Sequence, residues 1–415
     1  MGIASHRGAV LGGVLLLALV ATAGGCQTVS RAGAQRSAAL EPLRGPQGER
    51  KPGERPVFPD RELAARGYET LWDFYLGEPI TGAWILDRGL YLYTADAHLW
   101  AVDLADGRVT WKWDVPGGLS YAPGSYTYRE GGLNQPPELV VVAKDVLWVI
   151  DRNVGDPMWS LRLPFAASCP PVVSESHIYV GSWDGRIYAI SKEDRRVTWS
   201  YRTGGAITAR PAVAERTREA LLVGSEDGVV YGLSLYADER KWSVPTLGAI
   251  TAGLLNHKTY CYVASRDMNL YRIRIEDGLV DWRYAAGAVL TQSPVAFGRK
   301  TVLQVTGDHD LLSLDPTPAA RRKPLRWSAP DVSRFIAKTR SGVLAEATDG
   351  TLVLLADDTG ERRWDSGLQT GADVTAVNPY SPKSRVKDEA RIGSTVVLGY
   401  RDGWVVALRE KRAAY

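Results

Sequence analysis

The side chains that could carry out chemistry in this chain are few and widely spread. Histidine occurs at His6, His98, His177, His257 and His309. His6 falls in the expected signal; none of the other four has a second ligand at the spacing that a metal site needs, so we expect them to have turn or other structural roles. Gly307-Asp308-His309-Asp310 comes closest to a set of hard calcium ligands, but this tetrapeptide is typical of a hairpin turn. We therefore predict no catalytic, metal-binding or cofactor-binding residues.

Cysteine is also sparse, and it occurs at Cys26, Cys169 and Cys261. Cys169 and Cys261 lie in strand-like runs of different repeat copies, which separates them too widely for the short Cα distance of a disulfide. We expect both to be buried and unpaired, where they would pack as small apolar residues.

Cys26 stands where a cleavable leader would end. Arg7 supplies a positive charge, and an apolar run with VLLLALV at its centre follows from Ala9 to Ala23. This layout is typical of a secretory signal, and the run is shorter than the roughly 20 residues of a membrane-spanning helix. We predict a signal peptide over residues 1–25.

The tetrapeptide Ala23-Gly24-Gly25-Cys26 resembles a bacterial lipobox, although lipoboxes usually have leucine where Ala23 stands. The resemblance implies cleavage before Cys26, acylation of that cysteine and attachment of the protein to a membrane. Gln27, which is not aspartate, implies delivery to the outer membrane, facing the periplasm. The alternative is an ordinary cleaved signal beside a chance cysteine.

Residues 26–68 are expected to form a flexible tether. The segment is rich in Pro, Gly, Arg and Glu and has no hydrophobic period, so it cannot bury enough apolar surface to offset its ordering entropy. The whole chain has 50 Lys and Arg against 47 Asp and Glu, a formal net charge of +3. This near-neutral balance gives no electrostatic case for nucleic acid as a partner.

The region that would follow the tether contains a repeat marked by tryptophan. Consecutive members of one series lie 37 to 48 residues apart, the pitch of a propeller blade. The series is Trp72, Trp111, Trp159, Trp199, Trp242, Trp282, Trp327 and Trp364. We expect these rings to wedge between neighbouring blades.

Each tryptophan ends a unit of three apolar runs joined by two turns. Asp184-Gly185 is typical of the first turn, because glycine accepts the positive φ of a tight hairpin, and Asp277-Gly278 is typical of the second. Apolar and polar residues alternate within the runs, which predicts strands. We expect these three strands and the strand after the tryptophan to form one four-stranded sheet.

Stacking such sheets around an axis covers their apolar faces, so the sequence predicts an all-β, eight-bladed β-propeller over residues 69–415. The last unit ends without a tryptophan strand, whereas the segment around Trp72 is a tryptophan strand without a unit. Pairing the two ends would complete one blade and close the ring. A seven-bladed ring would require discarding one unit, and the one ending at Trp327 has the least regular turn.

The segment VGSWDGRIYAISKEDRRVTWSYRTGGAITARPAV closely resembles the repeat of pyrroloquinoline-quinone-like (PQQ-like) propellers. In that family a GS-x-DG-x-[IV]-Y-A hairpin is followed by a tryptophan strand and a TGG-x-I turn. The resemblance covers roughly residues 70–415 and is strongest over 178–255. It implies the fold but not quinone binding, because the repeat also occurs in proteins without a cofactor.

A lipid-anchored, eight-bladed propeller of this size resembles the BamB family, the accessory lipoproteins of the outer-membrane β-barrel assembly machinery. The resemblance implies a non-enzymatic scaffold that binds other envelope proteins, such as a β-barrel assembly complex. Loops such as Ser125–Gln135 and Asn378–Arg391 depart from the repeat pattern. No partner-contact residue can be transferred to this chain.

Two other classes stay open at this point. A PQQ-dependent quinoprotein oxidoreductase is favoured by the repeat and the export signal, but such alcohol dehydrogenases carry adjacent cysteines, which this chain lacks. A carbohydrate- or ligand-binding propeller would use exposed aromatic residues. The tryptophans outside the series are Trp84, Trp100, Trp113, Trp148, Trp183 and Trp404. We expect most of them to pack between blades, with Trp183, in a Ser-Trp-Asp-Gly turn, as the best candidate for exposure.

Overall fold

A computed structural model describes residues 64, 67–86, 89–128, 136–215, 219–297, 300–317, 320–339, 342–369, 374–378 and 395–410. Within residues 364–369 and 374–378 the description covers the backbone only. Cys26, the expected signal peptide and nearly all of the expected tether lie outside the described residues, as does most of the loops Ser125–Gln135 and Asn378–Arg391. Among the described residues, no helix has the length and apolar character to cross a membrane.

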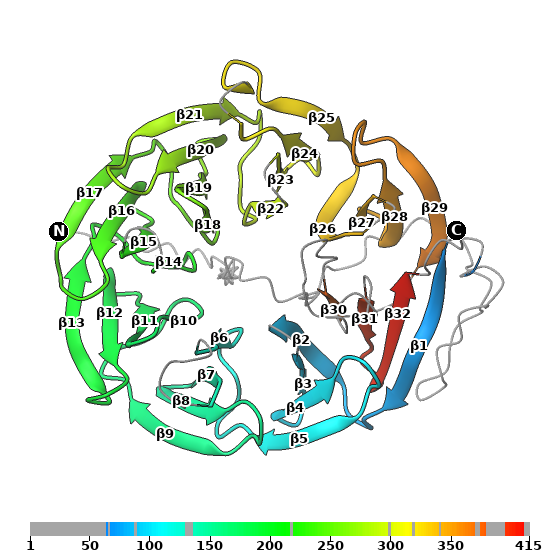
Figure 1. Ribbon diagram of the computed structural model, residues 1–415, viewed down its shortest axis with the longest axis horizontal. Helices are drawn as coiled ribbons and strands as arrows, with labels where there is room; N and C mark the ends of the chain where they lie inside the picture. The colour runs from blue at the N-terminus through cyan, green and yellow to red at the C-terminus, as the bar shows by residue number, and fades with distance from the viewer. Residues whose placement is uncertain are drawn as a thin grey trace, which may run out of the picture.

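Eight four-stranded antiparallel sheets form a ring, which confirms the eight-bladed propeller (Figure 1). The first four blades are as follows. Blade 1 contains β2 (Ile80–Leu86), β3 (Gly89–Thr94), β4 (His98–Asp103) and β5 (Val109–Asp114); blade 2 contains β6 (Gly124–Tyr126), β7 (Glu138–Ala143), β8 (Val146–Asp151) and β9 (Pro157–Arg162). Blade 3 contains β10 (Val172–Val173), β11 (His177–Gly181), β12 (Arg186–Ser191) and β13 (Arg196–Arg202); blade 4 contains β14 (Ala212–Ala214), β15 (Ala220–Gly224), β16 (Val229–Ser234) and β17 (Arg240–Pro245).

The second half of the ring repeats the plan. Blade 5 contains β18 (Leu255–His257), β19 (Tyr260–Ala264), β20 (Asn269–Arg274) and β21 (Val280–Ala285); blade 6 contains β22 (Val295–Phe297), β23 (Thr301–Val305), β24 (Leu311–Leu314) and β25 (Leu325–Ala329). Blade 7 contains β26 (Val332–Lys338), β27 (Val343–Ala347), β28 (Thr351–Leu355) and β29 (Arg362–Gln369); blade 8 contains β30 (Val374–Asn378), β31 (Thr395–Gly399), β32 (Trp404–Glu410) and β1 (Tyr68–Tyr75).

Blade 8 closes the ring with strands from both ends of the chain, as predicted. β1 pairs antiparallel with β32, so Tyr68 lies opposite Glu410 and Trp72 opposite Ala407. The unit ending at Trp327 forms a complete blade, so a seven-bladed ring is excluded. One detail of the prediction was wrong: the strand after each tryptophan joins the next blade as its innermost strand. After Trp199, for example, the next strand is β14, which pairs with β15 and not with blade 3.

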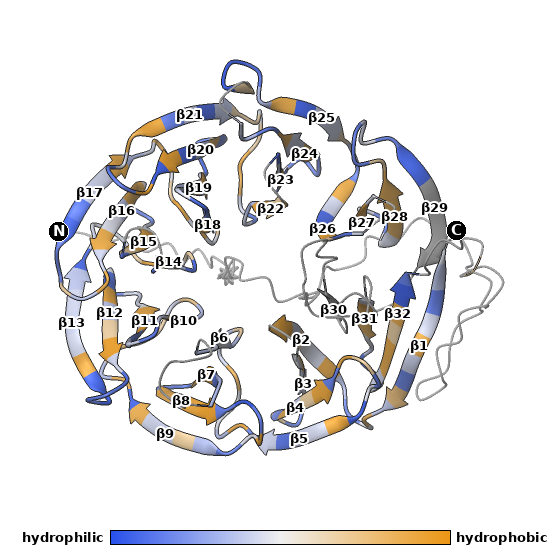
Figure 2. Cartoon of the chain, viewed as in Figure 1, coloured by the Kyte–Doolittle hydropathy of each residue, from blue (hydrophilic) through white to orange (hydrophobic). Residues whose placement is uncertain are grey.

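Burial explains why the strands have different compositions. The second strand of a blade is covered on both faces by neighbouring blades, and all residues of β7, β15 and β31 are buried. The outermost strand is covered on one face only, so β17 alternates between exposed and buried residues after its first position. Figure 2 shows the result as hydrophobic inner strands, such as β8 and β12, beside mixed outer strands.

All eight tryptophans of the series lie on the outermost strand of a blade. Among the side chains that the structure describes, the indole at four interfaces packs on a positive-φ glycine in the next blade's turn between third and fourth strands. Its N–H donates to a carbonyl three residues before that glycine. We call this pair of contacts the Trp–Gly clasp. The clasps join Trp72 to Gly107 and Leu104, Trp111 to Gly155 and Arg152, Trp242 to Gly278 and Ile275, and Trp327 to Gly360 and Asp357.

The clasp explains the glycine of the second turn. A Cβ on Gly278 would lie 2.8 Å from Cδ2 of Trp242, and the backbone there has φ +75°. Only glycine therefore satisfies both the left-handed backbone and the close approach of the ring.

Candidate functional site

The ring presents two faces with different loops. One carries the turns between second and third strands, such as Asp184-Gly185 and Asp227-Gly228, together with the links between blades; we call it the Asp-Gly face. The opposite face carries the other two sets of turns. Recognition in scaffold proteins is usually placed on such loops, so exposed groups on each face are the candidates for function.

Four large apolar side chains are exposed on the Asp-Gly face, on loops of blades 3 to 6. They are Trp183, Leu247, Met268 and Val289, which we call the apolar arc. Leu247 is 91% exposed and Trp183 is 58% exposed, values that no core-packing role explains. Exposed apolar residues on neighbouring loops are typical of a protein-binding surface, although the opposite face also has exposed apolar side chains, such as Val154, Tyr236 and Leu279.

Hydrogen bonds hold the loop that carries Leu247. The hydroxyl of the preceding Thr246 donates to the carbonyls of Gly228 (2.7 Å) and Gly248 (2.8 Å). The amide of Leu247 donates to Oδ2 of Asp267 at 3.1 Å. The side chain of Leu247 therefore projects to solvent from a fixed backbone.

Met268 and Val289 lie on the next loops around the ring. Met268 follows Asp267 in the turn between β19 and β20, at φ 67°, in the place that glycine takes in the Asp-Gly turns. Its carbonyl accepts a hydrogen bond from the amide of Ala286 (2.8 Å), and the carbonyl of Val289 accepts one from Gly307 (2.8 Å). Successive loops of the apolar arc are thus linked through their backbones.

Trp183 is held at two points. Its amide donates to the carbonyl of Ala166 (3.4 Å), and its indole N–H is hydrogen-bonded to the hydroxyl of Tyr121, which donates to the carbonyl of Ala167 at 2.8 Å. One edge of the indole is therefore fixed while much of the ring faces solvent. The prediction that Trp183 is the exposed member of its group is confirmed.

Aspartate carboxylates stabilise the turns of the Asp-Gly face through hydrogen bonds. Asp184 accepts the hydroxyl of Tyr188 (2.6 Å), and Asp267 accepts that of Tyr271 (2.5 Å). Burial alone would raise the pKa of Asp267, but hydrogen bonds from Tyr271, Leu247 and Asn269 outweigh it and lower this pKa below its ordinary value. The hydrogen bonds that hold these turns thus also stabilise the charged form of the carboxylates.

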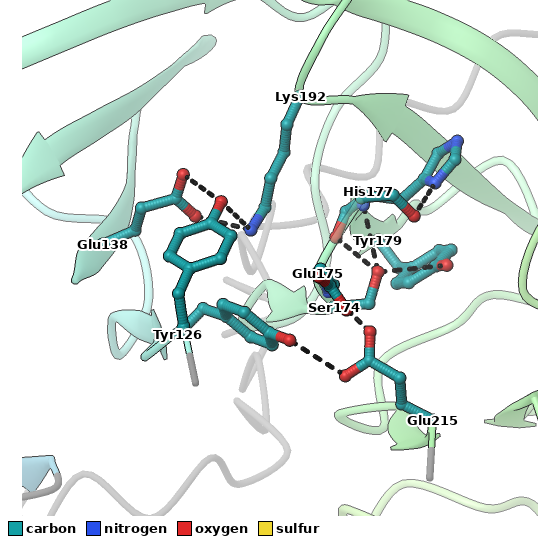
Figure 3. A network of polar contacts seen from close by, with 10 residues as sticks. Tyr126, Glu138, Ser174, Glu175, His177, Tyr179, Lys192 and Glu215 are labelled. Carbon is teal, nitrogen blue, oxygen red and sulfur yellow. Dashed lines mark hydrogen bonds and ion pairs between the residues drawn. The ribbon is translucent and has the colours of Figure 1, made fainter. Parts of the chain in front are cut away.

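A buried polar network occupies the opposite face, where blades 2, 3 and 4 meet (Figure 3). Nζ of Lys192 lies 2.5 Å from Oε2 of Glu138, and both side chains are more than nine-tenths buried. The same ammonium donates to the hydroxyl of Tyr128 (3.2 Å), which donates to Oε1 of Glu138 (2.9 Å). It also lies over the rings of Tyr126 and Tyr128, at 4.3 Å and 5.0 Å from their centroids.

The network continues into blade 4. Tyr126 donates to Oε2 of Glu215 (3.3 Å), and Oε1 of Glu215 accepts the amide of Glu175 (2.6 Å). We call Tyr126, Tyr128, Glu138, Glu175, Lys192 and Glu215 the polar belt. Burial lowers the pKa of Lys192, although Glu138, Glu215 and Glu175 act in the opposite direction. Burial, followed by the charge of Glu138, raises the pKa of Tyr128 far above its usual value.

The structure places the four described histidines apart from one another. His98 contacts Asp96 and Asp114, His177 contacts Ser176, His257 ends β18, and His309 lies in the predicted hairpin turn at φ 67°. Within the described part of the chain, no three His, Cys, Asp or Glu residues are grouped so that they could hold a metal ion.

Cys169 and Cys261 are buried and form no disulfide with each other, as expected. Cys169 lies in the link before β10 and not in a strand, and the neighbouring Ser168 donates its amide to the carbonyl of Gly181 in blade 3 (2.9 Å). Sequence reasoning did not identify the polar belt, whose members stand up to 89 residues apart, nor Leu247, whose surroundings look like any other link.

Comparisons with known proteins agree on the repeat. A family model described as outer membrane protein assembly factor BamB matches residues 132–249. Outer membrane protein assembly factor BamB of Bordetella pertussis is 30% identical over 139 residues, which is 33% of this chain and 34% of that protein. The match thus spans about a third of this relative's length.

Solved structures match over most of the ring. The crystal structure of BamB from Moraxella catarrhalis has a TM-score of 0.62 at 14% identity and covers 82% of this chain and 99% of its own. The computationally designed Ika8 protein has a TM-score of 0.58 at 18% identity, with 81% and 98% covered. At these identities the structures establish the β-propeller fold, and over residues 132–249 the sequence is similar to the BamB family model.

Proposed function

We propose that this protein is a non-enzymatic scaffold of the cell envelope that binds partner proteins during outer-membrane protein assembly. The apolar arc carries the proposal, since its exposed side chains lie on fixed loops of one face. The match of residues 132–249 to the BamB family model supports a role in outer-membrane protein assembly, because that segment contains Trp183 and Leu247 of the apolar arc. Acylation of Cys26 would hold the propeller at the membrane.

Co-purification tests this proposal directly. The tagged full-length protein is extracted from its native host in mild detergent, and bound proteins are identified. We expect an outer-membrane β-barrel insertase among them, and we expect Leu247→Ser combined with Met268→Ser to lose it. Val154→Ser is the matched control, because Val154 is 56% exposed on the opposite face. Retention of the insertase by the double variant would contradict a role for the apolar arc.

The anchor has a separate test. Cys26→Ser should release the protein in soluble form, because no acyl chains would be attached. Membrane association of this variant equal to that of the parent would reject lipidation at Cys26 without touching the scaffold proposal.

A carbohydrate-binding role is the second candidate, and the fixed, exposed indole of Trp183 favours it. Binding of envelope glycans that is lost in Trp183→Ala but kept in Leu247→Ser would support this candidate over the scaffold. A chromophore that co-purifies with the protein, or calcium-dependent binding of added quinone, would instead favour the quinoprotein alternative.

A further inference from the structure

Two adjacent interfaces, between blades 2 and 3 and between blades 3 and 4, lack the glycine of the Trp–Gly clasp. In blade 3, Arg195 occupies the glycine position at φ 54°, and in blade 4 the corresponding residue is Asp238. The carbonyl of Leu235, which matches the clasp acceptor, instead accepts the hydroxyl of Tyr179 at 2.8 Å. The buried indole Nε1 of Trp199 has no hydrogen-bond partner among the described residues.

The polar belt crosses these same two interfaces. Lys192 of blade 3 reaches Glu138 of blade 2, and Tyr126 of blade 2 is joined through Glu215 of blade 4 to the amide of Glu175 in blade 3. Lys192 occupies the turn position that Leu104, Arg152 and Ile275 occupy in clasped turns. In a clasped turn, the residue at this position accepts the indole N–H with its backbone carbonyl. In blade 3 it is the side chain of Lys192 that makes the contact, as part of the polar belt.

The Asp-Gly face of these blades is joined independently of the belt. Thr203 donates to the carbonyls of Gly185 and Gly205 (both 2.8 Å), and Ser225 of blade 4 donates to the carbonyl of Gly205 (3.2 Å). Asp227 accepts the amide of Gly204 at 2.7 Å. Loss of the belt would therefore leave these contacts in place.

We propose that the polar belt is a positioning device that replaces the missing clasps and keeps the ends of blades 2, 3 and 4 together on the face opposite the apolar arc. The physical reason is the buried Lys192–Glu138 pair: each charge is desolvated, so separating the blades at this end leaves the charges without their compensating partners. This inference concerns the ring itself and does not rest on the proposed function.

Hydrogen exchange of the full-length protein tests the proposal, because it reports local opening residue by residue. Lys192→Met leaves Glu138 buried without its partner, so exchange of the amide of Glu175 and of the amide at the substituted position 192 should accelerate roughly a hundredfold. Exchange at Thr203 and Thr246, on the Asp-Gly face, should stay within about threefold of the parent. Equal acceleration at both ends, or none at Glu175 and the substituted position 192, would overturn the proposal.

Milder variants keep the test informative if Lys192→Met fails to fold. Tyr126→Phe keeps the ring over Lys192 and removes only the hydroxyl that bonds Glu215, so exchange at Glu175 should rise about fivefold. Tyr188→Phe is the matched control, since its lost bond to Asp184 lies on the Asp-Gly face of blade 3. A response at Glu175 in the control equal to that in Tyr126→Phe would contradict the assignment.

The apolar double variant Lys192→Met/Glu138→Leu adds a recovery test. Replacing a buried ion pair by packed apolar residues is often close to neutral, so slow exchange at Glu175 should return. Exchange in the double variant as fast as in Lys192→Met alone would reject the pairing of Lys192 with Glu138 as the basis of the device.

Discussion

The interface between blades 4 and 5 and the interface between blades 3 and 4 solve one packing problem in two ways. In the first, Trp242 packs on Gly278 and donates to the carbonyl of Ile275 at 2.7 Å. In the second, Trp199 keeps its place on the outermost strand, but its indole N–H is unpaired within the described residues and polar side chains make the links. The repeated tryptophan therefore has the same position in both blades, but its indole N–H does not make the same hydrogen bond.

The interface between blades 5 and 6 departs in the same direction. The third turn of blade 6 is long, and Arg321 from it pairs with Asp281, the residue before Trp282. Asp281 also pairs with buried Arg272, whose guanidinium carbon lies 3.5 Å from the centroid of the Tyr260 ring. Here again a charged cluster lies where the clasp glycine is absent, so the two kinds of interface should respond differently to the same substitutions.

The largest difference is expected from the clasp glycine. Gly278→Ala should destabilise the protein by about 2–3 kcal/mol, because a left-handed alanine costs about 1–2 kcal/mol and its Cβ would press on Trp242. The reciprocal change Arg195→Gly relieves a positive φ where no clasp exists, and it should stabilise by at most about 1 kcal/mol. Chemical denaturation midpoints measure both, and equal effects of the two substitutions would erase the distinction between the interfaces.

A smaller contrast is expected from removing the indole N–H alone. Trp242→Phe leaves the buried carbonyl of Ile275 without its donor, which should cost about 1–2 kcal/mol beyond the lost ring area. Trp199→Phe loses no hydrogen bond, so it should cost only the lost area. The same denaturation series compares them, and a penalty for Trp199→Phe as large as that for Trp242→Phe would show that the unpaired N–H of Trp199 has a partner in solution.

The smallest effect is expected from a change of pH. It should act on the tyrosine–aspartate hydrogen bonds of the Asp-Gly face and not on the Trp–Gly clasps. Burial and the hydrogen bonds to Asp184 and Asp267 raise the pKa of Tyr188 and Tyr271 to about 12, above 10.0 for an ordinary tyrosine. The unfolded chain then loses these protons first, so stability should fall as pH rises from about 10 towards 12. Tyr188→Phe/Tyr271→Phe should flatten this decline in denaturation midpoints, whereas Trp242→Phe should leave its slope unchanged.

Local patterns in the sequence predicted most of the fold. The tryptophan spacing indicated the number of blades, and turn dipeptides such as Asp184-Gly185 located the hairpins, because both signals depend on residues close together in the chain. The unmatched strand around Trp72 predicted the closure. The assignment of the fourth strand failed because nothing local distinguishes a strand that ends one sheet from a strand that begins the next.

The candidate site was less accessible to sequence reasoning. Trp183 could be selected because a tight turn leaves an aromatic residue little to pack against. The exposure of Leu247 depends on what neighbouring loops leave uncovered, and the pairing of Tyr126 with Glu215 spans 89 residues. Such contacts come from the ring as a whole, and in the sequence Lys192 is simply one more charged turn residue.

The strand pair that closes blade 8 also determines how the ring carries mechanical load. The segment before Tyr68 leads directly into β1, so a pull along it acts first on the contact of Tyr68 with Glu410 and on the ion pair of Glu69 with Arg409. These pairs lie at one end of the β1–β32 ladder, so tension would break its hydrogen bonds one after another. Force applied to the N-terminal segment should therefore unzip the ring at its seam before it disturbs any other blade.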